Sequence, residues 1–247
     1  MWSGRLPRAD RYCFDDEGVH SLTSVRDPPP YSPSVSSSYW PMFDIRLTTP
    51  DLQLRHLTEG DLASLAAIVP EDAEQDPSLT TYAGLDARTD RAVALHQEYW
   101  RARGNWRPES WALSFSVFAN GHIVGYQGLE GEDFAILRTV DSSSFLTSGA
   151  RGRGWGKQMR AAVLTLAFGP LGARFAITSA WAENAASLGV SRALGYVDNG
   201  VSAHRRGDIA GEMTHLRLTR ERWLTSGWPE QVNVFGVEPC LAFFGLE

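Results

Sequence analysis

Residues 151–157 constrain the fold of this chain more than any other segment, because they carry three glycines between an expected strand and an expected helix. The preceding residues 140–148 are typical of a strand. Residues 155–168 place apolar side chains at positions 159, 162, 163, 166 and 167, which is the spacing of one buried helical face. The first N–H groups of a helix lack intrahelical partners, and glycines let an anion approach them closely. The segment therefore predicts a binding site for a pyrophosphate.

Two common phosphate-binding loops are excluded by the spacing of these glycines. A dinucleotide-binding loop needs G-x-G-x-x-G, but Lys157 or Met159 takes the third glycine position when the count starts at Gly152 or Gly154. A Walker A loop is also excluded, because its first glycine is missing and Gln158 replaces the hydroxyl that binds Mg²⁺.

The pattern that fits is R-x-x-G-x-G, formed by Arg151, Gly154 and Gly156. It resembles the signature of the GNAT superfamily of acyl-CoA-dependent N-acyltransferases, which lies between the fourth strand and the third helix of that fold. The alternative is an ordinary glycine-rich turn with solvated arginines.

A second block of sequence favours the resemblance. Residues 174–182 suit a strand, and they are followed by Asn184, Ser187, Ser191 and a Gly195-Tyr196 pair. This order is similar to the next motif of the superfamily, in which a strand, an asparagine and a short helix precede a glycine. Together with residues 43–55, the two blocks resemble the RimJ/RimL-like branch, especially its actinobacterial members, some of which use succinyl-CoA. The resemblance covers residues 40–223.

The resemblance implies a mixed α+β, three-layer αβα fold. Its central sheet has about seven mostly antiparallel strands, splays between strands four and five, and is flanked by helices. The residue patterns predict strands at 43–47, 52–56, 111–118, 123–129, 140–148, 174–182, 196–204 and 209–218. They predict helices at 61–69, 88–103 with Thr89 as its N-cap, 155–168, after Asn184, and at 221–225. The pair Asn120-Gly121 predicts a hairpin turn.

Length and composition favour one domain with extensions. We expect a flexible Ser/Pro-rich arm at 1–39, an acyltransferase domain at 40–227, and a tail at 228–247 that packs on the domain. Translation from a start near Met42 is an alternative explanation of the arm. Residues 71–77 form an acidic loop, which either attracts an ammonium substrate or is simply solvated.

The net charge and the positions of the cysteines argue against several kinds of protein and binding site. The net charge of −6 disfavours nucleic-acid binding, and no apolar run is long enough to cross a bilayer. Cys13 and Cys240 lie in separate terminal segments without metal-ligand spacing, so we expect no metal and no disulfide. We therefore expect a soluble, cytoplasmic protein, and leave open whether it forms a homodimer.

The resemblance also implies which residues bind CoA. The pantetheine is expected beside Phe145, Leu146 and Ser148 on strand four, where a backbone N–H polarises the thioester. Asn184 and Ser187 are expected to contact it from the following helix, although Asn184 also suits plain N-capping. The loop expected to bind the pyrophosphate consists of Arg151, Gly152, Arg153, Gly154, Trp155, Gly156 and Lys157.

The general base and acid follow from the same resemblance. Asp141 aligns with a glutamate that many members carry, and its shorter side chain calls for a bridging water. The alternative is a strand-end carboxylate satisfied by turn amides. Ser191 replaces the usual tyrosine, so Ser191, Ser187 or an ordered water is the candidate acid. The histidines at 56, 96, 122, 204 and 215 show no spacing that singles one out.

These features predict an acyl-CoA-dependent N-acyltransferase acting by direct transfer in a ternary complex. The co-substrate is acetyl-CoA or succinyl-CoA, and the acceptor is a primary amine of a small molecule or a protein. A succinyl carboxylate needs a cation, and the sequence offers Arg174, Arg192, Arg205 and Arg206. The alternative function is a GNAT-fold module that binds acyl-CoA without catalysis.

Overall fold

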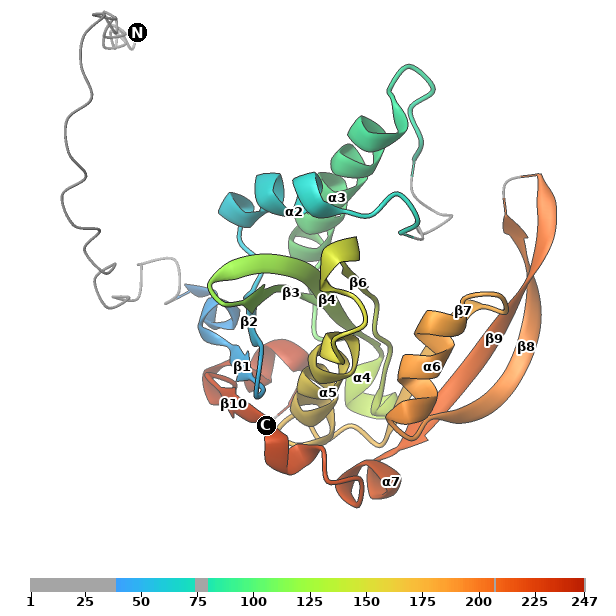
Figure 1. Ribbon diagram of the computed structural model, residues 1–247. Coiled ribbons are helices and arrows are strands. Elements are labelled where there is room, and N and C mark those ends of the chain that lie inside the picture. The colour runs from blue at the N-terminus through green and yellow to red at the C-terminus, as the bar shows by residue number, and fades with distance from the viewer. Residues whose placement is uncertain (1–38, 74–79, 207, 247) are drawn as a thin grey trace, which may run out of the picture. The chain divides into compact units, whose positions relative to one another are not determined.

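The computed structural model describes residues 39–73, 80–206 and 208–246 of the chain (Figure 1). They lie within one compact unit that spans residues 33–247. The expected arm, except Tyr39, lies outside the described residues, and so do Cys13 and residues 74–77 of the acidic loop. The division of the chain at residues 39 and 227 stays a prediction.

One sheet has six antiparallel strands and forms the centre of the unit. In spatial order its strands are β10 (Asn233–Phe235), β1 (Arg46–Thr48), β2 (Gln53–His56), β3 (Ser110–Ala119), β4 (His122–Glu132) and β6 (Ser144–Leu146). The turn predicted at Asn120-Gly121 joins β3 to β4, and both residues have the positive φ that a tight hairpin turn requires. Residues 41–44, part of which was predicted as strand, instead form a 3-10 turn that begins at Pro41.

A second sheet has four strands, in the order β5-β7-β9-β8. Their bounds are β5 (Thr139–Val140), β7 (Phe175–Trp181), β9 (Ile209–Thr219) and β8 (Val197–Arg206). The strand predicted at 140–148 is divided between the two sheets. Val140 pairs in parallel with Ala176 of β7, whereas Asp141 forms an antiparallel bridge with Glu130 of β4. The following strand β6 then pairs with β4, beginning at Ser144. The expected splay is confirmed, since β6 and β7 belong to different sheets. The described residues form ten strands, where about seven were expected.

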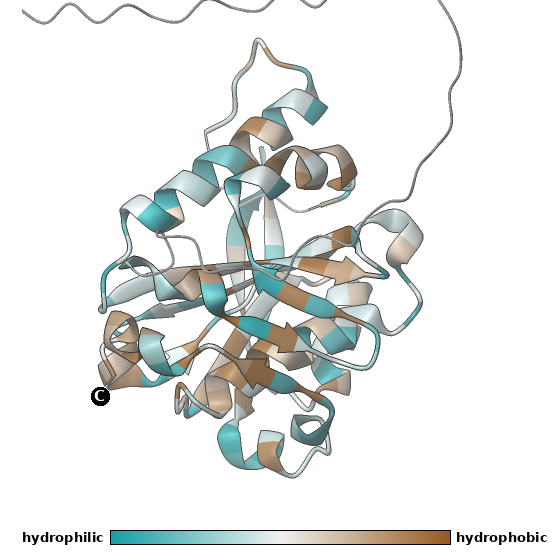
Figure 2. Cartoon of the chain, turned by 90° about the vertical axis from the view of Figure 1, so that its left-hand side faces the viewer, coloured by the Kyte–Doolittle hydropathy of each residue, from teal (hydrophilic) through white to brown (hydrophobic). Residues whose placement is uncertain are grey.

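Helices cover both faces of the six-stranded sheet. The helices are α2 (Leu62–Ile68), α3 (Ala87–Gly104), α4 (Phe134–Leu137), α5 (Trp155–Phe168), α6 (Ala185–Ala193) and α7 (Arg220–Leu224). On one face, Leu62, Leu65 and Tyr99 of α2 and α3 pack around Leu57. On the other face, α5 packs against the main core, and Figure 2 shows hydrophobic residues concentrated along the central strands. The predicted mixed α+β fold is confirmed.

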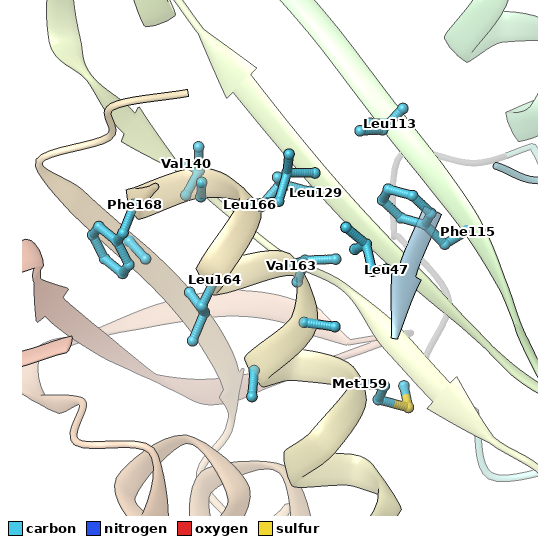
Figure 3. Close-up of a cluster of buried hydrophobic side chains, with 14 of the residues drawn as sticks. Leu47, Leu113, Phe115, Leu129, Val140, Met159, Val163, Leu164, Leu166 and Phe168 are labelled. Carbon is cyan, nitrogen blue, oxygen red and sulfur yellow. The ribbon is translucent and has the colours of Figure 1, made fainter. Parts of the chain in front are cut away.

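Helix α5 is buried on more than the one face that its sequence pattern predicts. Leu164 and Phe168 lie on the side of α5 opposite Val163 and Leu166, and all four are fully buried (Figure 3). Each such side chain contributes roughly 1.5–3 kcal/mol when taken out of water. The helix is enclosed because it packs against the central sheet and α6 at once.

The cap of α3 and the packing of the C-terminal end complete the fold. Helix α3 is capped by Asp86 and not by Thr89, because Asp86 Oδ1 accepts from the N–H groups of Arg88 and Thr89 at 3.0 and 3.1 Å. At the C-terminal end, β10 pairs with β1 and Phe244 is fully buried. The indole Nε1 of Trp106 donates to the carbonyl of Phe243 at 2.9 Å.

Candidate functional site

A cleft of about 540 Å³, here called the central cleft, opens where β6 separates from β7. Its lining comes from α3, β4, residues 142–146, and the first turns of α5 and α6. The outer edge of β6 pairs with no strand among the described residues, so its backbone groups face the cleft. This edge is suited to binding an extended ligand by main-chain hydrogen bonds.

The glycine-rich loop lies at the N-terminus of α5, as its sequence pattern predicts. Gly152 and Gly154 have φ of 78° and 79°, and no heavy atom beyond the adjacent residues lies within 4 Å of the position that a Cβ would take on either residue. Gly154 is the N-cap residue and Trp155 begins the helix. The first N–H groups of α5 therefore face an open, positively polarised surface.

Arg151 of this loop forms an ion pair with Asp72, which follows α2. Its two terminal nitrogens donate to the two carboxylate oxygens at 2.7 Å each, and its Nε donates to the carbonyl of Leu146 at 3.3 Å. The Arg151 guanidinium holds the pKa of the exposed Asp72 below its usual value. Both residues line the central cleft.

Asn184 caps a helix and also lines the central cleft, while its contact with the pantetheine stays a prediction. It is the N-cap of α6, where its Oδ1 accepts from the N–H of Ser187 at 3.0 Å, and both residues line the central cleft. Phe145 and Leu146 line the cleft too, and the Phe145 ring stacks on Tyr126 with 5.8 Å between centroids. Ser148 lies in the 3-10 turn after β6 and is not part of the lining.

Asp141 lies at the point where the two sheets part. It lines a second cavity of about 580 Å³, here called the side pocket, which meets the central cleft at Glu98, Ala102, Ala112 and Glu130. Burial raises the pKa of Asp141 to about 6, although the Ser142 N–H, at 2.6 Å, and the charges of Arg160 and His215 act to lower it. A carboxyl with this pKa can exchange a proton near neutral pH.

The two serines proposed as acids occupy different environments. Ser187 lines the central cleft. The Ser191 side chain is 1% exposed, its Oγ donates to the carbonyl of Ser187 at 3.1 Å, and it lines neither cavity. Ser191 is therefore less well placed than Ser187 to meet a ligand.

Sequence analysis did not identify two residues that the fold brings to the cleft. Tyr126 lies on β4, its hydroxyl is 3.1 Å from Ser114 Oγ, and burial raises its pKa. Arg160 lies on α5 within a run of apolar residues and is nevertheless part of the cleft lining. In the sequence, Arg160 was marked only by being a charged residue inside an apolar helical run. No sequence pattern marked Tyr126.

The fold also connects histidines that looked unrelated in sequence. Ser202 Oγ lies 2.7 Å from Nε2 of His204 and 2.5 Å from Nε2 of His215. The Nδ1 of His215 lies 2.8 Å from Ser179 Oγ, and Ser179 lines the central cleft. The pairing of β8, β9 and β7 produces this row.

The side pocket is lined by four acidic side chains. They belong to Glu98, Glu130, Glu132 and Asp141, and Arg101, which forms an ion pair with Glu98, lies beside them. Such a lining attracts cations.

The described residues contain neither a grouped metal-ligand set nor a helix suited to a membrane. No set of three or more His, Cys, Asp and Glu side chains in residues 39–73, 80–206 and 208–246 is grouped to hold a metal ion. Within the same ranges, no helix has both the length and the apolar character needed to cross a membrane.

Known structures share this fold. RimJ of Mycobacterium smegmatis, solved in complex with CoA-disulfide, superposes with a TM-score of 0.58 at 18% identity, over 78% of this chain and 98% of RimJ. A chimera of the spermidine N-acetyltransferase SpeG from Vibrio cholerae and hSSAT gives a TM-score of 0.55 at 14% identity, over 71% of this chain and 99% of the chimera. At these identities the likeness establishes the fold alone. The family model described as "Acetyltransferase (GNAT) domain" matches residues 51–197, well over half of the sequence. The chain therefore belongs to the GNAT acetyltransferase family, whose members are N-acyltransferases.

Proposed function

We propose that this enzyme transfers an acyl group from acetyl-CoA or succinyl-CoA to a primary amine by direct attack within a ternary complex. The observation that carries the proposal is the arrangement of three features around one opening. The glycine-rich loop borders the central cleft, the unpaired edge of β6 runs through it, and Asp141 lines the side pocket that adjoins the cleft.

The donor enters from the glycine-rich loop. Its pyrophosphate binds at the N-terminus of α5, where the residues 151–157 supply backbone N–H groups and basic side chains. Its pantetheine follows the edge of β6 past Leu146 and Phe145, opposite Asn184 and Ser187 of α6. This path brings the thioester to the part of the cleft lined by Ser143 and Ser144.

The acceptor enters through the side pocket. An amine is protonated at neutral pH, and the carboxylates of Glu98, Glu130, Glu132 and Asp141 attract its ammonium form. The acceptor is a small molecule with an amino group or an amino group of a protein.

The nitrogen must lose two protons on the way from ammonium to amide, and the CoA thiolate must gain one. Asp141, directly or through a water, accepts a proton from the ammonium, and the neutral nitrogen attacks the thioester carbonyl carbon. A new C–N bond forms, and a backbone N–H of β6 stabilises the oxyanion. The C–S bond then breaks, and the CoA thiolate takes a proton from Ser187, Tyr126 or water. The second proton, which the nitrogen loses as the amide forms, replaces the proton given to the thiolate.

The test measures release of free CoA with a thiol reagent, for acetyl-CoA and succinyl-CoA against a panel of amines. We expect amine-dependent release, and we expect it to fall at least about 100-fold in Asp141→Asn. Asp198→Asn is the matched control, because Asp198 is an exposed carboxylate that pairs with Arg192 outside both cavities. Binding of CoA esters in a calorimeter with no turnover on any amine would instead identify a non-catalytic binding module.

A further inference from the structure

Arg160 is a buried cation in the wall of the central cleft. It lies on α5, one turn beyond the glycine-rich loop, and it is only 4% exposed to solvent. Transfer of a guanidinium from water into a protein interior is costly unless a counter-charge or a full set of acceptors surrounds it.

The polar contacts of Arg160 are few and long. One terminal nitrogen donates to Thr178 Oγ1 at 3.4 Å and the other to Ser144 Oγ at 3.3 Å, while its Nε has no hydrogen-bond partner among the described residues. Ser144 lies on β6 and Thr178 on β7. The guanidinium therefore spans the opening between the two diverging strands and bonds only neutral hydroxyls there.

No carboxylate in the described part of the chain forms a salt bridge with Arg160. Its charge acts to lower the pKa of the buried Asp141 carboxyl without a direct bond, and its guanidinium also interacts with the Tyr196 hydroxyl, which is neutral. Within the described residues, the guanidinium in the wall of the cleft therefore contacts hydroxyl groups and no carboxylate, which is the arrangement expected for a cation that meets an anion brought by a ligand.

The position of Arg160 identifies the part of the ligand that meets it. The donor path of the proposed function passes Leu146 and Phe145 and ends at Ser143 and Ser144, and Ser144 bonds Arg160. The part of the donor that reaches Arg160 is therefore the acyl group, and not the pyrophosphate or the pantetheine.

We propose that Arg160 binds a carboxylate at the far end of the acyl group, so that the enzyme selects a donor of the succinyl type. This inference rests on the proposed function, since it assumes that the acyl-CoA occupies the central cleft. Arg192 pairs with Asp198, and the Arg205 side chain is 83% exposed, so neither replaces Arg160 in this role.

The test compares succinyl-CoA with butyryl-CoA, whose acyl group has the same number of carbons and no charge. Dissociation constants are measured by calorimetry for the intact chain, for Arg160→Met and for Arg192→Met. We expect the intact chain to bind succinyl-CoA about tenfold or more tightly than butyryl-CoA, since a charge-assisted bond replaces an apolar contact. Arg160→Met should bring this ratio to about one or below, and Arg192→Met should preserve it.

Melting temperature separates this role from a structural one. A guanidinium reserved for a ligand weakens the unliganded fold, so Arg160→Met should melt at the same temperature as the intact chain or higher. If Arg160→Met fails to fold, Arg160→Gln and the ratio in the intact chain still decide the question.

Equal or tighter binding of butyryl-CoA by the intact chain, or a succinyl preference that survives loss of Arg160, would overturn the proposal. Failure of the proposed function has another signature, in which neither CoA ester binds or both bind without transfer to any amine. A binding preference for succinyl-CoA without transfer would support the site while refuting the enzyme reaction.

Discussion

Arg151 and Asp72 form a bidentate ion pair, with two N–O distances of 2.7 Å, at the mouth of the central cleft. It links the segment after α2 to the loop before α5, which lie 79 positions apart in sequence. Arg151 is also the basic residue expected to meet the CoA pyrophosphate. The carboxylate of Asp72 and the phosphates therefore compete for one guanidinium.

This competition predicts that Asp72→Asn binds acetyl-CoA more tightly than the intact chain. An exposed ion pair contributes up to about 1 kcal/mol, so the gain in affinity should reach about fivefold at most. Raising the salt concentration should shrink the difference. Asp198→Asn, which removes a comparable exposed Arg–Asp pair, should leave the affinity unchanged. Weaker binding by Asp72→Asn would show that the pair organises the loop and does not compete with the ligand.

The glycine-rich loop predicts a specific effect of a negative charge at Gly154. Gly154→Glu places a carboxylate at the N-terminus of α5 and should weaken acetyl-CoA binding at least about tenfold. Gly227→Glu is the control, because Gly227 has a similar φ of 73° and equally open surroundings but lies after α7 and not in the glycine-rich loop. Both variants should lose similar thermal stability from backbone strain, of roughly 1–2 kcal/mol. Similar loss of affinity in the two would argue against this loop as the pyrophosphate site.

The pKa of Asp141, raised to about 6 by burial, predicts the pH dependence of turnover. A general base acts in its ionised form, so kcat/KM should rise with pH up to about 6 and then level off. Asp141→Asn should lose this rising limb along with most of the rate. The measurement is kcat/KM from pH 5 to pH 8 for both proteins. An unchanged profile in Asp141→Asn would place the base on another carboxylate of the side pocket.

His56 predicts a loss of stability in acid. Its pKa is lowered to about 3, chiefly by burial and also by the charges of Arg103 and Arg46, while a bond to the Leu57 carbonyl acts in the opposite direction. The unfolded chain binds a proton near pH 6.5 and the folded chain only near pH 3, so stability is full above 6.5 and falls as the pH drops between these values. The slope should be about 1.4 kcal/mol per pH unit.

Urea unfolding at pH 7, 6 and 5 measures this slope for the intact chain and for His56→Gln. The variant should show a shallower slope, whatever its stability at pH 7. His122→Gln, at an exposed position in the hairpin between β3 and β4, should keep the slope of the intact chain. Equal slopes in all three proteins would assign the acid sensitivity to other groups.

The sequence by itself determined the elements whose signals are local. The apolar spacing in residues 155–168 gave the bounds of α5, and Asn120-Gly121 gave the turn between β3 and β4. The glycines of the loop and Asn184 at the start of α6 were located for the same reason, since helix ends and positive φ depend on a few adjacent residues. The family resemblance rested on these local features.

Only the tertiary structure decided which side chains meet in the site. The Asp72–Arg151 pair, the row from His204 to Ser179 and the contacts of Arg160 join segments that no sequence spacing relates. The division of one predicted strand between two sheets places Asp141 at the opening, and its burial there shifts its pKa. Burial, long-range pairing and local dielectric are properties of the packed chain, so the burial of the Arg160 charge and the raised pKa of Asp141 arise only once both sheets have assembled around α5.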